Sequence, residues 1–216
     1  MNDSFLTLTE PTYGEYKEKG SKFLAYCFPF DNENQLPEIM EKLKSDHPKA
    51  RHYCFAYKIG IDNNRYRTND DGEPSGTAGK PILGQIASHQ LTNVLIVVVR
   101  YFGGTKLGAS GLIHAYRQAA IEGLTNATVI EQFLTSTYEL NFTYEHMGSI
   151  MAALKNLYID ITDKSFDSTC VVKIEIRNSE AAQKIILLKS HLLGISSDQV
   201  SEDTVVGYCS IIKVNE

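Results

Sequence analysis

Tryptophan is absent from this 216-residue sequence, and its four cysteines form no CxxC pair. Without paired cysteines the chain offers neither a disulfide framework nor a zinc knuckle. Most of the cysteines, such as Cys54 in HYCF, lie in apolar stretches typical of buried core thiols. A thiol hydrolase would need a base beside Cys54, for which His52 and His114 are the candidates. We expect no metal site and assign no catalytic residue.

A long hydrophobic run is also missing. The longest, Val94 to Val99, falls far short of the roughly 20 residues that a membrane-spanning helix needs. The first twenty residues contain no basic start followed by an apolar core. With 43% hydrophobic and 22% charged residues, the composition is that of a folded domain protein. We therefore expect a cytoplasmic protein with no signal peptide and no membrane partner.

The common nucleotide-binding motifs are absent too. The glycine-rich segment 72–80 ends in Lys80-Pro81, where a Walker loop requires Ser or Thr after the lysine, and there is no GxGxxG. The carboxylates at 70, 71 and 73 lack the spacing of an EF-hand calcium loop. These absences disfavour an ordinary ATPase, GTPase or Rossmann dehydrogenase, and we expect no cofactor.

The second half of the chain has the clearest pattern of elements. Periodicity predicts strands at 135–144, 159–167, 170–177 and 204–214, with helices at 146–158 and 179–193. This βαββαβ order is that of a ferredoxin-like domain. Residues 131–216 hold 7 basic against 12 acidic residues, and an acidic surface of this kind favours contact with a protein partner.

The first half mixes strands with helices. The predicted strands are 13–18, 22–30, 52–59, 65–68 and 94–101, and the predicted helices are 34–46, 81–89 and 110–127. Asp62, Asn63 and Asn64 predict a turn between two of these strands. Asn69–Lys80 has no apolar periodicity, which predicts a long loop with a function. We expect an α+β fold with two domains, 1–130 and 131–216.

Basic residues gather between Lys49 and Arg117, where nine of them face four acidic ones. There a glycine loop, Phe102–Gly111, leads from a strand into a helix whose first N–H groups can hold an anion. The candidate nucleic-acid or anion contacts are Arg51, His52, Arg65, Arg67, Lys80, Arg100, Tyr101, Gly103, Gly104, Lys106, Gly108, Ser110 and Arg117. The candidate functional loop contains Asp70, Asp71, Gly72, Glu73, Pro74, Ser75 and Gly76.

Three segments resemble the signature of the YigZ/IMPACT family: ARHYCFAY (Ala50–Tyr57), NDDGEPSGTAGKPIL (Asn69–Leu83) and VVVRYFGGTKLGASGLIHAY (Val97–Tyr116). The resemblance covers the whole chain, because prokaryotic members also carry a ferredoxin-like second domain. It implies a first domain with a ribosomal-protein-like βαβ fold similar to domain IV of elongation factor G. It implies a second domain similar to domain V of that factor. Both domains of the factor work against RNA on the ribosome.

The resemblance also implies a role in translation, since eukaryotic relatives are linked to translational control under stress. We expect a non-enzymatic protein that binds RNA or the ribosome. The alternative is an enzyme, or a binder of a small phosphorylated ligand, with a pocket between residues 69–80 and 103–111. Cations spread over an open face would favour RNA, and cations lining one cleft would favour the small ligand. A third hypothesis is an adaptor that binds protein through the acidic second domain.

Overall fold

The computed structural model describes residues 3–61 and 65–214, so the turn predicted at 62–64 lies outside the described residues. The chain divides into two compact units. The first unit spans Phe5–Gln132, and the second unit begins at Phe133 and includes Asp3 and Ser4. No helix among the described residues is long and apolar enough to cross a membrane. The α+β fold class is confirmed, and the division near residue 130 supports our proposal of two domains.

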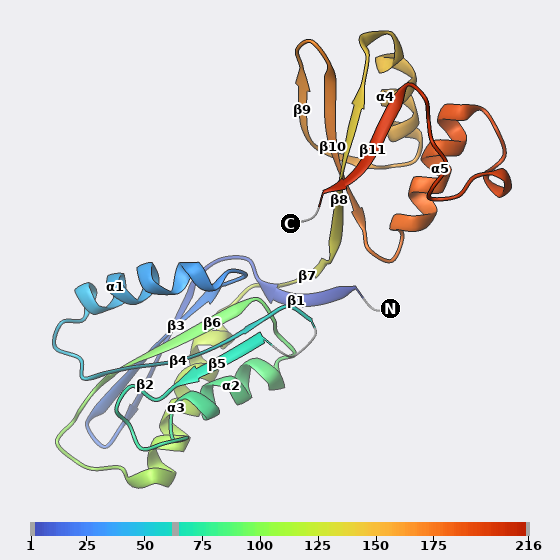
Figure 1. Cartoon of the computed structure of the whole chain (residues 1–216). Helices are drawn as coiled ribbons and strands as arrows, with labels where there is room; N and C mark the ends of the chain where they lie inside the picture. Colours follow the sequence, from blue (N-terminus) through green and yellow to red (C-terminus); the bar gives the residue numbers. More distant parts are fainter. Residues whose placement is uncertain (1–2, 62–64, 215–216) are drawn as a thin grey trace. The chain divides into compact units, whose positions relative to one another are not determined.

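The first unit is built on a five-stranded antiparallel sheet with strand order β2-β3-β6-β4-β5. Its strands are β2 (Thr12–Glu18), β3 (Ser21–Pro29), β4 (His52–Ile59), β5 (Arg65–Asn69) and β6 (Val94–Tyr101). Its helices are α1 (Leu36–Asp46), preceded by the 3₁₀ turn η1 (Glu33–Gln35), α2 (Gly79–Ser88) and α3 (Gly108–Thr125). Figure 1 shows α1 on one face of the sheet and α2 and α3 on the other.

The start of α2 lies earlier in the chain than the sequence predicts. The prediction placed it at Pro81, whereas the helix begins at Gly79. Proline is tolerated in the first turn because the N–H groups there have no partner within the helix. The long loop therefore ends two residues sooner than expected.

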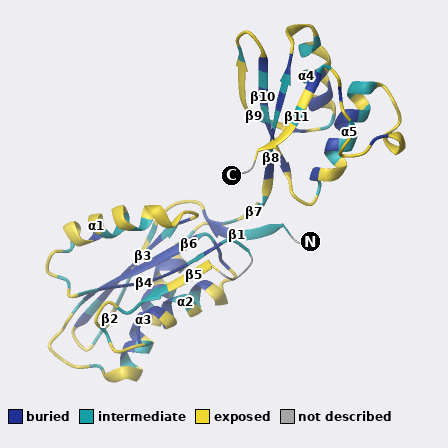
Figure 2. Cartoon of the chain, viewed as in Figure 1, coloured by how far each residue is buried: buried dark blue, intermediate teal, exposed yellow. Residues whose placement is uncertain are grey.

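Strand β6 separates two hydrophobic cores. Its odd-numbered residues from Leu95 to Val99 pack with α1, while its even-numbered residues from Val94 to Val98 pack with α2 and α3. All six are fully buried, which explains the continuous apolar run in the sequence. In Figure 2 the central strands are accordingly dark blue. The alternation continues to the end of the strand and places Arg100 and Tyr101 on opposite faces.

Two short strands were not predicted. They are β1 (Ser4–Leu8) and β7 (Val129–Phe133), which pair with each other in a separate two-stranded sheet. The backbone N–H of Thr92 also donates to the carbonyl oxygen of Leu6, at 2.9 Å, which fastens β1 to the first unit. The partners lie at opposite ends of the unit's sequence, so no local pattern reveals the pairing.

The second unit has a four-stranded antiparallel sheet with strand order β11-β8-β10-β9. Its strands are β8 (Thr135–Phe142), β9 (Asp160–Phe166), β10 (Cys170–Arg177) and β11 (Cys209–Val214). Its helices are α4 (Met147–Asn156) and α5 (Ala181–Leu193), with 3₁₀ turns η2 (Tyr144–His146) and η3 (Ser197–Gln199). This is the ferredoxin-like arrangement that the sequence predicts. Strand β11 begins later than expected, because turns at 201–204 and 206–209 precede it.

Candidate functional site

A pocket of about 520 Å³ opens in the first unit where β6 ends. It lies between the 70–78 loop and the segment that joins β6 to α3, which is where the sequence-based alternative placed a pocket. Its lining residues are Arg51, His52, Glu73, Pro74, Arg100, Phe102, Lys106, Leu107, Gly108, Ala109 and Leu112. It therefore combines three cations, a carboxylate, a histidine and an apolar wall.

A buried ion pair forms the polar centre of the pocket. Glu73 Oε1 accepts hydrogen bonds from Arg100 Nη1 at 2.5 Å and from the Tyr116 hydroxyl at 2.8 Å. The side chains of Glu73 and Arg100 are only 5% and 6% exposed, so salt screens their attraction little. His52 Nε2 lies 3.9 Å from the same carboxylate oxygen. These four residues are called the Glu73 cluster below.

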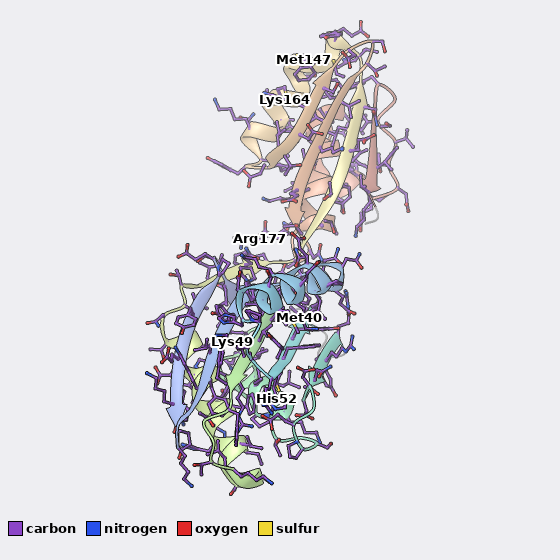
Figure 3. The ribbon with its side chains drawn as sticks, turned by 90° about the vertical axis from the view of Figure 1, so that its left-hand side faces the viewer. Met40, Lys49, His52, Met147, Lys164 and Arg177 are labelled. Carbon is purple, nitrogen blue, oxygen red and sulfur yellow. The ribbon has the colours of Figure 1, made fainter. Side chains whose placement is uncertain are left out.

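The orientation of His52 is set by the loop beside it. Its Nδ1 lies 2.8 Å from the carbonyl oxygen of Asp71. Because a carbonyl oxygen only accepts hydrogen bonds, Nδ1 carries the proton of the neutral ring. Nε2 then has a free lone pair and lies on the side of Glu73. Figure 3 shows His52 in the first unit, beside the 70–78 loop. His52 can therefore accept a hydrogen bond through Nε2 when neutral and donate one when protonated.

Cys54 lies behind this cluster and is fully buried. Its Sγ lies 3.0 Å from the carbonyl oxygen of Asp70 and 3.3 Å from the Tyr116 hydroxyl. Burial raises the pKa of the Cys54 thiol, and burial likewise raises the pKa of the Tyr116 hydroxyl. Both groups therefore stay protonated near neutral pH, and a thiol of this kind is structural.

The two aspartates of the candidate loop hold the loop in shape. The Asp70 carboxylate accepts hydrogen bonds from the backbone N–H groups of Gly76 at 2.8 Å and of Ala78 and Gly79 at 2.9 Å each. Burial acts to raise the pKa of Asp70, but these three N–H donors outweigh it and the pKa is lowered. The Asp71 carboxylate accepts a backbone N–H of β4. Their hydrogen bonds are thus directed at the protein backbone.

The glycines before α3 have different roles. A Cβ on Gly103 would lie 1.8 Å from the carbonyl carbon of Gly20, and its N–H donates to the Ser21 hydroxyl at 3.1 Å. Gly104 and Gly108 have φ values of +87° and +71°, in the left-handed region that favours glycine. Of these predicted site glycines, Gly108 lines the pocket, and the other two shape the turn.

Several predicted contacts belong to the opposite face of the sheet. On β5, Arg65 and Arg67 pair with Ile59 and Tyr57, whose side chains belong to the core on the α1 side. Tyr101 faces the same side as these arginines. The remaining predicted residues are exposed or half-buried elsewhere: Lys80, Ser110 and Arg117 on the helices, and Gly72, Ser75 and Gly76 in the loop.

Phe102 is a pocket residue that the sequence reasoning missed. Its side chain is exposed, at 45% of its surface, and its ring lies 5.7 Å from Arg100 Cζ. Tyr116 was missed as well, because its hydroxyl reaches Glu73 from inside the core. The signal for Phe102 was its position between a strand and a glycine turn, two residues after Arg100.

These features define a two-unit α+β protein with a cationic pocket in its first unit. Residues 19–124 match the family model described as the Impact N-terminal domain. The chain is 38% identical over 155 residues to IMPACT family member YvyE of Bacillus subtilis (strain 168), which covers 72% of this chain and 71% of that protein. It is 29% identical over 183 residues to IMPACT family member YigZ of Escherichia coli (strain K12), covering 84% and 90%.

A solved structure extends the likeness to the whole fold. It is the crystal structure of a protein described only as hypothetical, with a TM-score of 0.70 and 26% identity, and it covers 100% of both chains. The chain therefore belongs to the IMPACT family, and the resemblance that its sequence segments carry is confirmed.

Proposed function

We propose that the first unit binds RNA, or an RNA surface of the ribosome, and that the protein takes part in the regulation of translation. The observation that carries the RNA proposal is the exposed ring of Phe102 in one pocket with Arg51 and Lys106. Cations contact phosphates, and an exposed aromatic ring stacks on a base whatever its sequence. The combination suits single-stranded RNA.

The connection with translation rests on membership of the IMPACT family and on what the sequence resemblance implies. A protein with this role works in the cytoplasm, which is the location that we propose. The acidic second unit is proposed as the surface for a protein partner.

The distribution of cations sharpens the proposal. Of seven arginines and lysines named from the sequence, three line the pocket: Arg51, Arg100 and Lys106. Arg65 and Arg67 lie on the α1 side of the sheet, where they contact Glu33 and the ring of Phe55. RNA bound at the pocket therefore contacts the three pocket cations and leaves Arg65 and Arg67 in solvent.

A salt series tests this proposal. We expect affinity for ribosomes and for single-stranded RNA to fall steeply with salt, and the variant Arg51→Ala/Lys106→Ala to lower the log–log slope by about 2. The matched control is Arg65→Ala/Arg67→Ala, which removes the same charge from the opposite face. A flat salt response, or equal weakening by both double variants, would contradict the proposal.

A second candidate function is the binding of a small phosphorylated ligand. It is favoured by the apolar wall of Leu107 and Leu112 beside the three cations in one pocket. A thermal-shift series with phosphorylated metabolites tests it. A raised unfolding temperature in a protein that retains no RNA at low salt would favour this function over the first.

A further inference from the structure

Helices α2 and α3 begin on the same side of the sheet and differ in what the described residues place at their first N–H groups. The start of α2 donates backbone N–H groups to the Asp70 carboxylate. Within the described part of the chain, Leu107 at the N-cap of α3 makes no side-chain capping hydrogen bond, and the first turn of α3 contains no acidic residue. The first N–H groups of a helix favour an anion. Gly108 and Ala109 line the pocket, so the start of α3 forms part of its wall.

Arg100 supplies an independent sign of a missing acceptor. Among the residues that the structure describes, Arg100 Nε is a buried side-chain nitrogen without a hydrogen-bond partner. The residue is 5% exposed and lines the pocket, and Glu73 holds its Nη1 in place. A buried charged donor left unpaired is unfavourable, and because Arg100 lines the pocket, an anion that reaches its guanidinium there would lower that cost.

The cations of the pocket favour the end of a strand. The inner wall of the pocket consists of buried side chains, those of Glu73, Arg100 and Leu112, while Phe102 and Lys106 at the rim are exposed. Each phosphodiester of a strand that runs past carries a single negative charge. A terminal phosphomonoester can enter, and near neutral pH it carries roughly −1.5 to −2 charges, more than a phosphodiester.

We propose that the pocket binds the terminal phosphomonoester of an RNA strand. The phosphate lies against the first N–H groups of α3 and against Arg100. Arg51 and Lys106 add positive charge at the mouth of the pocket, and the terminal base stacks on Phe102. The inference rests on the proposed function, since it names the part of the RNA that this site recognises. A free nucleotide has the same phosphomonoester chemistry, and the experiment separates the two.

The test compares three forms of one short RNA bound to the full-length protein: with a 5′-phosphate, with a 3′-phosphate and with neither. We expect one phosphorylated form to bind at least about tenfold more tightly than the unphosphorylated strand, the factor of roughly one charge-assisted hydrogen bond. Arg51→Ala/Lys106→Ala should lose this preference, and Arg65→Ala/Arg67→Ala should keep it. Fluorescence anisotropy at fixed salt measures all three affinities.

Competition with adenosine monophosphate separates the two sources of the phosphate. We expect this nucleotide to displace the phosphorylated strand. Equal affinity for the three RNA forms, or a strand that stays bound at saturating nucleotide, would overturn end recognition while RNA binding itself stands. Binding of the nucleotide without any retention of RNA would overturn both proposals and favour the small-ligand function.

Discussion

The two faces of the sheet in the first unit each carry a polar cluster at the end of β6, and the clusters differ in how completely they are hydrogen-bonded. On the α1 side, His47 lies between two tyrosines: its Nε2 is 2.7 Å from the Tyr26 hydroxyl and its Nδ1 is 2.9 Å from the Tyr101 hydroxyl. The Tyr53 hydroxyl donates to the His47 carbonyl oxygen at 2.7 Å. Both ring nitrogens of this His47 cluster therefore have partners.

On the other side, the Glu73 cluster is incomplete. Arg100 and Tyr116 donate to Glu73, yet among the described residues the Nε of Arg100 has no partner. A satisfied polar network rigidifies a fold, whereas a partly satisfied one loses stability unless something else supplies the missing acceptor. We propose that the His47 cluster serves structure and that the Glu73 cluster serves binding.

The largest expected effect comes from breaking the buried ion pair. Glu73→Ala should lower the free energy of unfolding by about 3–5 kcal/mol, because it leaves the Arg100 charge buried without a counter-ion. Urea unfolding measures the loss. The matched control is Glu33→Ala, whose carboxylate lies 3.9 Å from Arg65 with both side chains half exposed. The control should stay within about 0.5 kcal/mol of the wild type. Equal losses in the two variants would remove the distinction between the buried and the exposed pair.

The second prediction concerns the loop that carries Glu73. Asp70→Asn should lower the free energy of unfolding at neutral pH by about 2 kcal/mol, because the amide cannot accept all three backbone hydrogen bonds. Because the pKa of Asp70 is lowered, its carboxylate stabilises the fold at pH values above its ordinary pKa of 3.8. That stabilisation is lost as the pH falls through the lower folded-state value.

The difference in the free energy of unfolding between wild type and Asp70→Asn should therefore become smaller as the pH is lowered. Urea unfolding at several pH values measures it. The exposed Asp198→Asn in the second unit makes the same chemical change without buried backbone partners and serves as the control. A difference that stays constant into the acid range would show that the Asp70 charge does not hold the loop.

The sequence predicted those features that local patterns determine. The apolar run ending in Arg100 revealed a strand covered on both faces, and the order of elements revealed the ferredoxin-like second unit. The glycine-rich segments on either side of the pocket were recognised as its borders. In each case the signal lies within a few consecutive residues.

Other features depend on pairings that local patterns do not contain. The strands β1 and β7 pair across the full length of the first unit's sequence. The register of β5 against β4 decides on which face Arg65 and Arg67 lie, and no alternation within RYRTN reveals it. The strand period could have separated Tyr101 from Arg100, since neighbours on a strand face opposite sides. The role of Asp70 became visible only with its backbone donors.

The smallest effect compares two neighbouring aromatic residues on the two faces. Tyr101→Phe should lower the free energy of unfolding by about 1 kcal/mol, because it removes one hydrogen bond from the His47 cluster. It should leave RNA affinity unchanged, since the side chain faces away from the pocket. Phe102→Ala should do the reverse and weaken RNA binding by about 1–3 kcal/mol through the loss of stacking.

Urea unfolding measures the stability of both variants, and fluorescence anisotropy measures their affinity for RNA. Tyr101 and Phe102 are adjacent in sequence, so a general disturbance at the end of β6 would affect stability and binding together in each variant. Equal weakening of RNA binding by Tyr101→Phe and Phe102→Ala would place the RNA contact outside the pocket. If each variant alters one property alone, stability is assigned to the face with the His47 cluster and RNA contact to the face with the pocket, because Tyr101 contacts His47 and Phe102 lines the pocket.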